Sequence, residues 1–438
     1  GYDVPEAYQL ISSGDTDAVF QLEQGGMKKF MKDLQPNCLE DLIAGISLYR
    51  PGPMDFIPKY IQNKHHPEGI VYDTPYLEPI LKNSYGVIVY QEQVMQIFQH
   101  LAGYSLGQAD LVRRAMAKKH LDELMAQKNK FIYGDIENGG NITGCVSKGI
   151  PAEVAAKIFS DMESFASYAF NKSHAAAYAV VAYRTAYLKY FYPKEFLAGI
   201  LNDRLDKIEE ISKYIAYMKE RGIEVLQPDI NRSKTIFAVE GKGLRIGLGA
   251  LRGIGIEAIE SVISERDEHG EFADFADFNV RCAKYINKRI VESLIYAGAF
   301  DCFGYPRSVF IAVYEEVLAR VTAMEKQKSG NQISLFGNII EEEKVVIDYP
   351  VIPEYDQAEK LSLEKSVLGV YVSGHPFEKY APYFKDRTFN CSMLQYEEDE
   401  ETGEKKYTEI ESGQQATMGG MISAYKKLQT KSGSSMAF

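Results

Sequence analysis

Apolar residues recur at every third or fourth position over most of the chain, the spacing of helices with one buried face. This spacing predicts helices at 24–34, 38–48, about 151–165 and 206–221. A further amphipathic helix is predicted from Leu361 to Val372, ended by residues 373–376. These expectations favour a mainly α protein with several helical regions.

Short β-like segments interrupt this pattern in the second half of the chain. The sequence changes character between 222 and 251, and we place a domain boundary near 225–245. Polar residues at 325–344 predict a linker, and 397–401 predicts an acidic loop. Near the C-terminus, strands are expected at 416–425 and 435–438, joined by a loop at 426–433.

Two turn motifs lie near the start of the chain. Gly14-Asp15-Thr16-Asp17 places two carboxylates two residues apart, a spacing that can hold metal ions when it lies on a strand. Its composition is instead typical of a turn and a helix N-cap, so we interpret it as structural. Arg50-Pro51-Gly52-Pro53 predicts a rigid corner that presents Arg50, because two prolines fix φ around a glycine.

The sequence LGQADLVRRAMAKK, at 106–119, predicts a helix with a cationic side and an apolar seam. Its cations are Arg113, Arg114, Lys118 and Lys119, and its seam is Leu111, Val112, Ala115 and Met116. Residues four apart share a helix face, and Arg forks with Lys point charges suit an anion with many oxygens, such as a triphosphate. From this run alone, a solvated amphipathic helix remains the alternative.

An alanine-rich helix is predicted after His174, and Pro193 ends it. Just before it lie Asn171, Lys172, Ser173 and His174, and its predicted periodic face is Tyr178, Val181, Ala182, Thr185 and Leu188. Polar side chains and free N–H groups at a helix N-terminus form a ready anion site. The alternative is an ordinary N-cap.

Two hairpin motifs follow in the second half. Leu251-Arg252-Gly253-Ile254-Gly255 with Ala258 has the pattern of a helix–hairpin–helix, whose glycines let the backbone approach a DNA phosphate. Such a contact carries no base information. Asn287-Lys288-Arg289 opens a degenerate second copy. The alternative for the second copy is a tight turn between packed helices.

The predicted linker contains one apolar pentamer, Gln332-Ile333-Ser334-Leu335-Phe336. Adjacent Leu335 and Phe336 have no nearby core to join in a solvated segment. Burying them in a partner's pocket would release about 1.5–3 kcal/mol each before ordering costs. The pentamer therefore suits a peptide docking site.

Composition limits the class of protein. The 438 residues exceed one compact core, so two to four units are expected, and 45% hydrophobic with 25% charged residues is an ordinary soluble balance. The net charge of -12 argues against a nucleic-acid coat but leaves room for local basic sites. Five scattered cysteines make no CxxC site and fit a reducing cytoplasm. No apolar run approaches the length of a membrane span, and the first residues lack a signal-peptide layout.

Taken together, these segments resemble the α subunits of bacterial DNA polymerase III, the C-family replicative polymerases. The resemblance covers nearly the whole chain in order. It rests on GDTDAVFQLE, LYRPGPM, YGVIVYQEQVMQI, LGQADLVRRAMAKK, FASYAFNKSHAAAYAVVAYRTAYLK, the GIG hairpin, LIYAGAFD, QISLF, LGVYVSGHP and TKSGSSMAF. The departures are Ala18, Ala117, Ser167 and Ala169, each at a position where the family commonly has Gly.

The resemblance implies four regions: a helical fingers domain at 1–225, a tandem helix–hairpin–helix region at 226–322, a clamp-binding segment with a connecting helix at 323–390, and a partial OB-fold at 391–438. It implies that Arg113 and Arg114 reach the triphosphate of the incoming dNTP. Lys118, Lys119 and the Asn171–His174 turn are weaker candidates for contact with the same dNTP.

The resemblance also implies partners. Arg252, Gly253, Ile254 and Gly255, with Lys288 and Arg289, would hold primer–template duplex, and residues 332–336 would dock on the sliding clamp, the β subunit. Other replisome subunits are further expected partners, and a membrane is not.

The family's reaction is nucleotidyl transfer by two metal ions, Mg²⁺, held by palm aspartates for which this sequence offers no candidate. We therefore expect no catalytic residue and no metal ligand here, and no primer extension by this chain alone. Both ends are expected to be internal to a longer protein. The alternative function is a non-catalytic DNA- and clamp-binding module. The sequence does not distinguish the main replicase from an error-prone paralogue of the same family.

Overall fold

The computed structural model describes residues 1–118, 121–166, 170–205, 207–329 and 345–384. Beyond these it describes 389, 396–398, 405–407, 413, 415, 417, 419–420, 422, 425–429 and 435–437. Over these residues the protein is mainly helical, as the sequence predicts. The chain divides into two compact units, Gly1–Leu197 and Ala198–Phe438, which are described separately. No described helix has the length and apolarity needed to cross a membrane.

The first unit is built of helices joined by short turns. Its α-helices are α1 (Pro5–Ser12), α2 (Gly25–Leu34), α3 (Leu39–Leu48), α4 (Ile57–His65), α5 (Glu78–Leu81), α6 (Gln91–Ala102), α7 (Leu106–Lys118), α8 (Leu121–Tyr133), α9 (Ala152–Ala166) and α10 (Lys172–Phe191), and α11 (Pro193–Asn202) follows at its end. Its 3₁₀ turns are η1 (Pro53–Phe56), η2 (Pro67–Gly69), η3 (Pro75–Leu77), η4 (Lys82–Ser84), η5 (Ile136–Asn138) and η6 (Val146–Lys148). The predicted helices at 24–34, 38–48 and 151–165 are confirmed as α2, α3 and α9.

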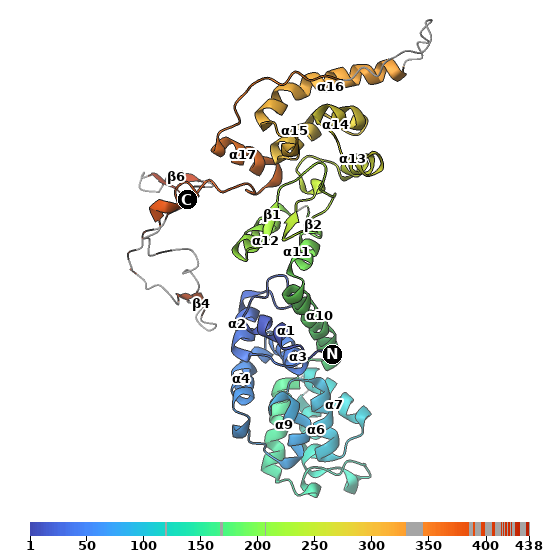
Figure 1. Cartoon of the computed structure of the whole chain (residues 1–438). Helices are drawn as coiled ribbons and strands as arrows, with labels where there is room; N and C mark the ends of the chain where they lie inside the picture. The colour runs from blue at the N-terminus through green and yellow to red at the C-terminus, as the bar shows by residue number, and fades with distance from the viewer. Residues whose placement is uncertain are drawn as a thin grey trace. The chain divides into compact units, whose positions relative to one another are not determined.

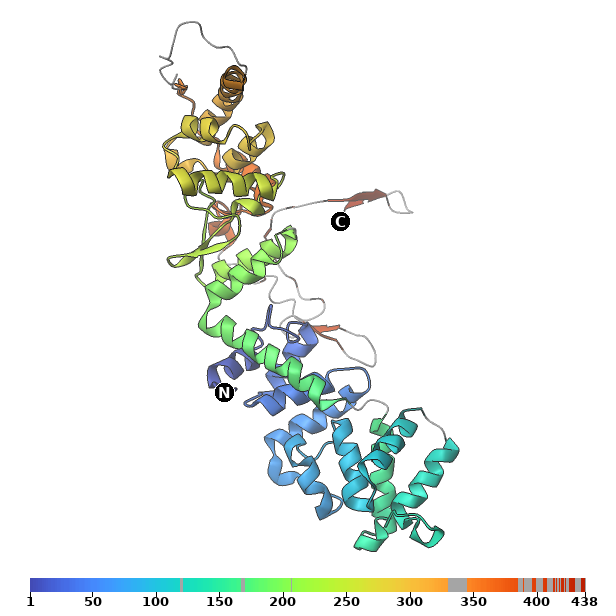
Figure 2. The ribbon, with the colours of Figure 1, turned by 90° about the vertical axis from the view of Figure 1, so that its right-hand side faces the viewer.

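Two hydrophobic cores divide this unit into two lobes (Figure 1, Figure 2). The first lobe packs α1 to α4 around α10, and the second packs α5 to α9 together. Tyr90, which belongs to the first core, forms an isolated parallel bridge with Phe170. The Gln91 amide donates to the Phe170 carbonyl over 3.0 Å. Because of this bridge, the N-termini of α6 and α10 lie side by side.

The buried face of α10 differs from the predicted one. Val181 and Leu188, both on the predicted periodic face, are 42% and 46% exposed. The buried face carries Ala175, Ala179, Ala182, Tyr183, Ala186 and Lys189. Its alanines allow α3 to pack closely against α10, because small side chains shorten the distance between helix axes. In a helix rich in alanine, packing rather than hydropathy selects the buried face.

The Gly14–Asp17 segment is a turn, as predicted, but it caps no helix. The Thr16 hydroxyl donates to the Leu22 carbonyl over 2.5 Å and closes the loop. Asp17 pairs with Lys28 at 2.7 Å, and Asp15 pairs with buried Lys189 at 3.0 Å. The N-cap of the following helix is Gln24, so the N-cap part of the prediction is wrong.

The same loop holds Ala18 in a left-handed backbone conformation, with φ at 61°. A β-carbon costs about 1–2 kcal/mol there, whereas glycine adds about 0.5–1 kcal/mol of chain entropy on folding. We therefore expect Ala18→Gly to stabilise the chain by about 0.5–1 kcal/mol in urea unfolding. Ala177→Gly, in the middle of α10, is the control and should destabilise by about 1 kcal/mol. A lower midpoint for Ala18→Gly would contradict the strain.

The second unit begins with α12 and a small mixed sheet, followed by helices. Its elements are α12 (Ile208–Glu220), β1 (Glu224–Leu226), β2 (Ala238–Glu240), β3 (Gly243–Arg245), η7 (Leu248–Ala250), α13 (Ile256–His269), α14 (Phe275–Cys282), α15 (Lys288–Ala297), η8 (Asp301–Phe303), α16 (Arg307–Ser329), α17 (Gln357–Leu368) and η9 (Ala381–Phe384). The sheet order is β1-β3-β2, with β1 parallel and β2 antiparallel to β3. Five buried phenylalanines form the helical core, Phe272, Phe275, Phe278, Phe300 and Phe310. Helix α12 confirms the prediction at 206–221.

Two predictions in this unit are wrong in extent. Helix α16 continues to Ser329, so the first five residues of the predicted linker are helical. Helix α17 starts at Gln357 and ends at Leu368, where Gly369 adopts a φ of 77°. The predicted end at residues 373–376 is therefore too late, because a glycine that takes the left-handed C-cap position stops the helix earlier.

The C-terminal strands pair in two separate two-stranded sheets. They are β4 (Tyr396–Glu398) with β5 (Lys405–Tyr407), and β6 (Lys427–Gln429) with β7 (Ser435–Ala437), both antiparallel. Strand β4 takes the first two residues of the predicted acidic loop, 397 and 398, and residues 399–401 of that loop lie outside the described residues. The strand predicted at 416–425 is absent from the described residues there, and β6 lies in the predicted joining loop. Strand β7 lies where a strand is predicted, and the OB-fold itself stays a prediction.

Candidate functional sites

Helix α7 carries the predicted cationic run and is fixed at its start by a reciprocal cap. The Ser105 amide donates to the Gln108 side chain over 2.8 Å, and the Gln108 amide donates to the Ser105 hydroxyl over 3.3 Å. Ala109, Val112 and Met116 are buried against the second lobe's core. The seam differs from the prediction at one position, since the Leu111 side chain is exposed at 69%.

One carboxylate holds the two candidate arginines of α7. The Arg113 Nε and Nη2 donate to one oxygen of Asp110 over 3.1 and 2.8 Å, and Arg114 Nη2 lies 2.9 Å from the other. The hydrogen bond from Arg113, with that from Arg114, holds the pKa of Asp110 below its usual value. The Arg113 side chain is 15% exposed and that of Arg114 is 65% exposed. Asp110 thus orients two guanidinium groups, one half-buried and one open to solvent.

Asp110 was missed by the sequence prediction, although the spacing could have revealed it. It precedes the arginines by three and four residues, the two separations at which helical side chains meet. Of the other predicted cations, Lys118 ends the helix and Lys119 lies outside the described residues.

The second nominated anion site, at the start of α10, already contains protein acceptors. The Asn171 side chain accepts from the His174 amide over 3.0 Å, which confirms the N-cap interpretation. Both Glu92 oxygens lie 3.1 Å from the Lys172 amide, and the Lys172 ammonium lies 2.9 Å from Glu40. A carboxylate from α6 therefore occupies part of the position that an anionic ligand would take. Ser173 and His174 are exposed.

The first predicted hairpin is a tight turn between η7 and α13. Gly253 has a φ of 80°, and Gly255 is the N-cap of α13. Ile254 is half-buried between the two glycines. The element before this turn is only a 3₁₀ turn, so the first of the two helices implied by the motif is reduced to η7.

The second predicted hairpin joins α14 to α15 and meets the first one. Asn287 caps α15 by accepting from the Ile290 amide over 3.0 Å. The Arg289 guanidinium packs on Gly253, since a β-carbon added there would lie 2.6 Å from its Nε. The Ser293 hydroxyl also donates to the Arg252 carbonyl over 3.3 Å. The fold thus brings together two motifs that lie almost 40 residues apart.

Two arginines at this junction are available to a ligand. Arg252 and Arg289 are exposed, and neither guanidinium forms a hydrogen bond or ion pair with any other residue that the structure describes. Lys288 differs, because it pairs with Glu315, whose hydrogen bond raises the pKa of Lys288. The site is therefore cationic mainly through Arg252 and Arg289.

Comparisons with known proteins match the same regions. A family model described as the bacterial DNA polymerase III alpha subunit finger domain matches residues 2–139, and one described as a helix-hairpin-helix motif matches residues 222–310. DNA polymerase III subunit alpha of Thermus aquaticus is 39% identical over 441 residues, covering 99% of this chain and 34% of that protein. The proteins of the same name from Chlamydia pneumoniae and Aquifex aeolicus are 42% and 39% identical, covering 86% and 99% of this chain and 30% and 34% of theirs.

The chain belongs to the DNA polymerase III α-subunit family. The resemblance seen in the sequence is confirmed. The chain spans about a third of the length of the relatives that it matches. The predicted boundary between the fingers domain and the hairpin region, at 225/226, remains a prediction. The match to the finger-domain model ends at residue 139, and the match to the helix-hairpin-helix model starts at residue 222. The two compact units of the structure meet between Leu197 and Ala198.

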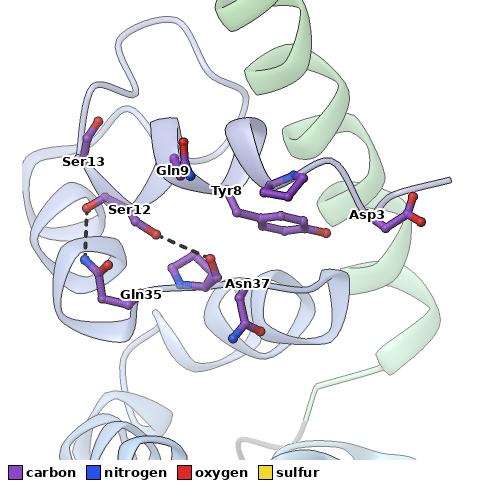
Figure 3. A pocket seen from close by; sticks show the side chains of 9 residues that line it. Asp3, Tyr8, Gln9, Ser12, Ser13, Gln35 and Asn37 are labelled. Carbon is purple, nitrogen blue, oxygen red and sulfur yellow. Dashed lines mark hydrogen bonds between the residues drawn. The ribbon is translucent and has the colours of Figure 1, made fainter.

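Two other features bear on ligand binding, a pocket beside α1 and the distribution of possible metal ligands. An open pocket of about 680 Å³ lies beside α1 and is lined by Asp3, Pro5, Tyr8, Gln9, Ser12, Ser13, Gln35, Pro36 and Asn37 (Figure 3). Its lining contains no cation, so it does not suit a phosphate. Among the described residues, no group of three or more His, Cys, Asp or Glu side chains could hold a metal ion.

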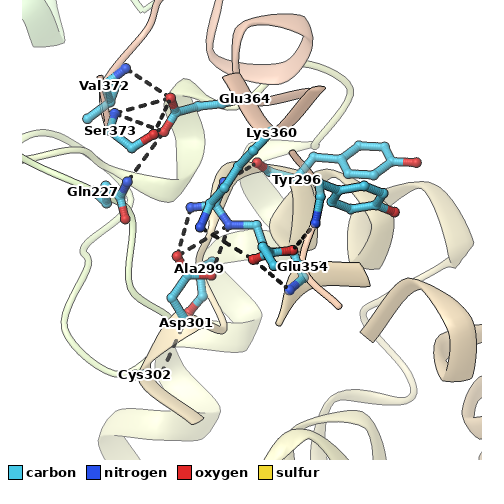
Figure 4. Close-up of polar contacts among 12 residues, drawn as sticks. Gln227, Tyr296, Ala299, Asp301, Cys302, Glu354, Lys360, Glu364, Val372 and Ser373 are labelled. Carbon is cyan, nitrogen blue, oxygen red and sulfur yellow. Dashed lines mark hydrogen bonds and ion pairs between the residues drawn. The ribbon is translucent and has the colours of Figure 1, made fainter. Parts of the chain in front are cut away.

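A buried polar network supports the tandem hairpins (Figure 4). Glu354 accepts from the Arg307 and Ser308 amides over 3.2 and 3.3 Å and so caps α16. Buried Glu364 accepts from the Val372 and Ser373 amides over 3.1 Å, and Gln227 donates to it over 3.4 Å. The Arg252 amide donates to the Val367 carbonyl over 2.8 Å, which ties α17 to the first hairpin.

Proposed function

We propose that this chain is the part of a bacterial replicative DNA polymerase that receives the incoming dNTP and holds the primer–template duplex. The observation that carries the nucleotide half is the Asp110–Arg113–Arg114 arrangement on α7. Two guanidinium groups held by one carboxylate present several N–H donors in a preset geometry, which suits a triphosphate. Substitution of Arg113 in the full-length polymerase tests this half.

In this proposal the chain contributes charge and position to the nucleotidyl transfer. The described residues form no group of three or more side chains that could hold a metal ion, and the proposal assigns the family's divalent ions to the palm aspartates that the resemblance implies. Arg113 is the principal ligand, since its guanidinium is held most firmly. Arg114, Lys118 and Lys119 add positive charge. The Asn171–His174 turn is a secondary contact, because its Lys172 amide already donates to Glu92.

The DNA half of the proposal rests on the junction of the two hairpins. The backbone of Gly253, Ile254 and Gly255 approaches one phosphate, and Arg252 and Arg289 neutralise it together with its neighbour. Lys288 contributes less because Glu315 already pairs with it. Phosphate contacts of this kind do not depend on the base sequence of the DNA, as a replicative enzyme requires.

Salt dependence tests the hairpin contacts. We expect log Kd for a short duplex to rise with log salt, with a slope that falls by about 0.9 when Arg252→Ala or Arg289→Ala removes one phosphate contact. Fluorescence anisotropy of a labelled duplex titrated with the 438-residue chain measures it. Arg320→Ala, at a 55% exposed position on α16, is the control and should leave the slope unchanged. An unaltered slope in both hairpin variants would remove these arginines from the interface.

We further propose that Gln332–Phe336 docks on the sliding clamp, that residues 391–438 begin an OB-fold, and that the parent protein works in the cytoplasm with other replisome subunits. The pentamer lies outside the described residues, and its support is the apolar pair within a polar sequence. Leu335→Ala with Phe336→Ala should abolish clamp binding, measured by surface plasmon resonance, and leave extension on short templates unchanged. Retained clamp binding would exclude the motif.

The second candidate function is a DNA- and clamp-binding module without a nucleotide. It shares the hairpins and the pentamer, and it requires no nucleotide contact from α7. The two functions therefore differ in whether Arg113 affects nucleotide incorporation.

A further inference from the structure

Four aromatic rings form a continuous row on one face of the first lobe. Phe170, just before α10, and His174 and Tyr178 on α10 are spaced four residues apart, with ring centroids 5.4 and 4.4 Å apart. The ring of Phe20 continues the row, 5.2 Å from that of Tyr178. We call these four residues the aromatic ladder. None of them has a role in the contacts described for Arg113 and Arg114.

The outer end of the ladder is presented by an unusual loop. Phe20 is 38% exposed and lies between Ala18 and Gln21, two non-glycine residues with φ of 61° and 63°. The Phe20 amide donates to the Thr185 hydroxyl of α10 over 3.2 Å, which fixes the loop against that helix. Left-handed conformations at two non-glycine residues cost free energy, so the loop holds an apolar ring in solvent at an energetic cost.

The other end of the ladder carries a cation on a rigid corner. The Arg50 guanidinium lies 3.7 Å from the centre of the Phe170 ring. Arg50 precedes the Pro51-Gly52-Pro53 turn, in which Gly52 has a φ of 100°, so the backbone is stiff at this point. The guanidinium forms no hydrogen bond or ion pair with the described residues. Its donors are therefore available to an anion while its plane covers the ring.

We propose that the aromatic ladder binds unpaired bases of single-stranded DNA, with Arg50 on the adjacent phosphate. Every base has a π-face that can stack on an aromatic ring, and a cation beside the rings holds the backbone, which is how sequence-tolerant single-strand sites are built. The rings are too close together for a base to enter between them, so bases stack on the exposed faces and on the Phe20 end. Duplex DNA hides these base faces, so the site selects single strands. This inference shares His174 with the proposed secondary nucleotide contact and does not involve Arg113 or Arg114.

The test compares a normal strand with an abasic one. Fluorescence anisotropy measures binding of a labelled 12-residue oligo-dT, or of an abasic 12-mer with the same phosphates, to the 438-residue chain. His174→Ala and Phe20→Leu should each weaken oligo-dT binding about 5- to 30-fold and leave abasic binding unchanged. Val181→Ala, at an exposed non-aromatic position of α10, is the control and should change neither. Tyr178→Phe keeps the ring and should bind as the original chain does.

Photocrosslinking locates the contact even if other parts of the chain also bind the strand. An oligonucleotide with 5-iodouracil should crosslink to peptides that contain Phe20, His174 or Tyr178. Crosslinks that avoid all of these peptides would overturn the proposal, as would equal weakening of the oligo-dT and abasic strands. Loss of the crosslinks with excess dTTP would also overturn it, because it would give the ladder to the base of the incoming nucleotide.

Discussion

Replacing Arg113 with alanine in the full-length polymerase is expected to lower kcat/KM for the incoming nucleotide by about 10²–10³-fold. The guanidinium is half-buried and held by Asp110 through two of its nitrogens, so its donors are fixed before the nucleotide arrives. Preset donors stabilise developing charge without reorganising, and their loss appears mainly in kcat. Steady-state incorporation of a single nucleotide, measured over a range of dNTP concentrations, separates kcat from KM.

Two variants make this result interpretable. Arg113→Lys keeps the charge but loses the planar fork, so it should recover only part of the activity. Leu111→Ala changes an exposed side chain on the same helix and should stay within about twofold of the original enzyme. Duplex binding should be the same in all three variants. An Arg113→Ala enzyme with unchanged kinetics would favour the non-catalytic binding module.

The second large effect is on stability, and it concerns Arg307 in the second unit. The Arg307 side chain is 2% exposed, and its Nη2 lies 2.7 Å from a carboxylate oxygen of Asp301. Its Nη1 also donates to the Tyr296 carbonyl over 3.0 Å. Arg307→Ala leaves the Tyr296 carbonyl and the 34% exposed Asp301 without this buried partner, so it should destabilise the chain by about 1–3 kcal/mol. Urea unfolding followed by circular dichroism measures this.

The matched control is an arginine on the same helix. Arg320 is 55% exposed and pairs with Glu316 one turn earlier, so Arg320→Ala should cost less than about 0.5 kcal/mol. The loss of stability should therefore be large only for the buried arginine and not for the exposed one. Similar costs for the two variants would show that the Arg307 network contributes little.

Local patterns located several helices but not always their ends or faces. Helices α2, α3, α9 and α12 follow from apolar spacing, since one buried stripe gives a strong periodic signal. The end of α17 was misplaced because Gly369, a C-cap, precedes the more conspicuous Ser373–Pro376 sequence. In α10 the periodic face was wrong, because alanines give little hydropathy contrast and close packing by α3 decides.

The candidate sites show the same division between local and long-range information. The sequence alone determined the family and the positions of the cationic helix and the two hairpin turns, because each depends on neighbouring residues. Only the tertiary structure showed that Glu92 reaches the start of α10, that Arg289 packs on Gly253, and that Phe20 and Arg50 extend the rings of α10. These contacts join residues from 36 to 158 positions apart, and such contacts depend on how helices pack rather than on any local pattern.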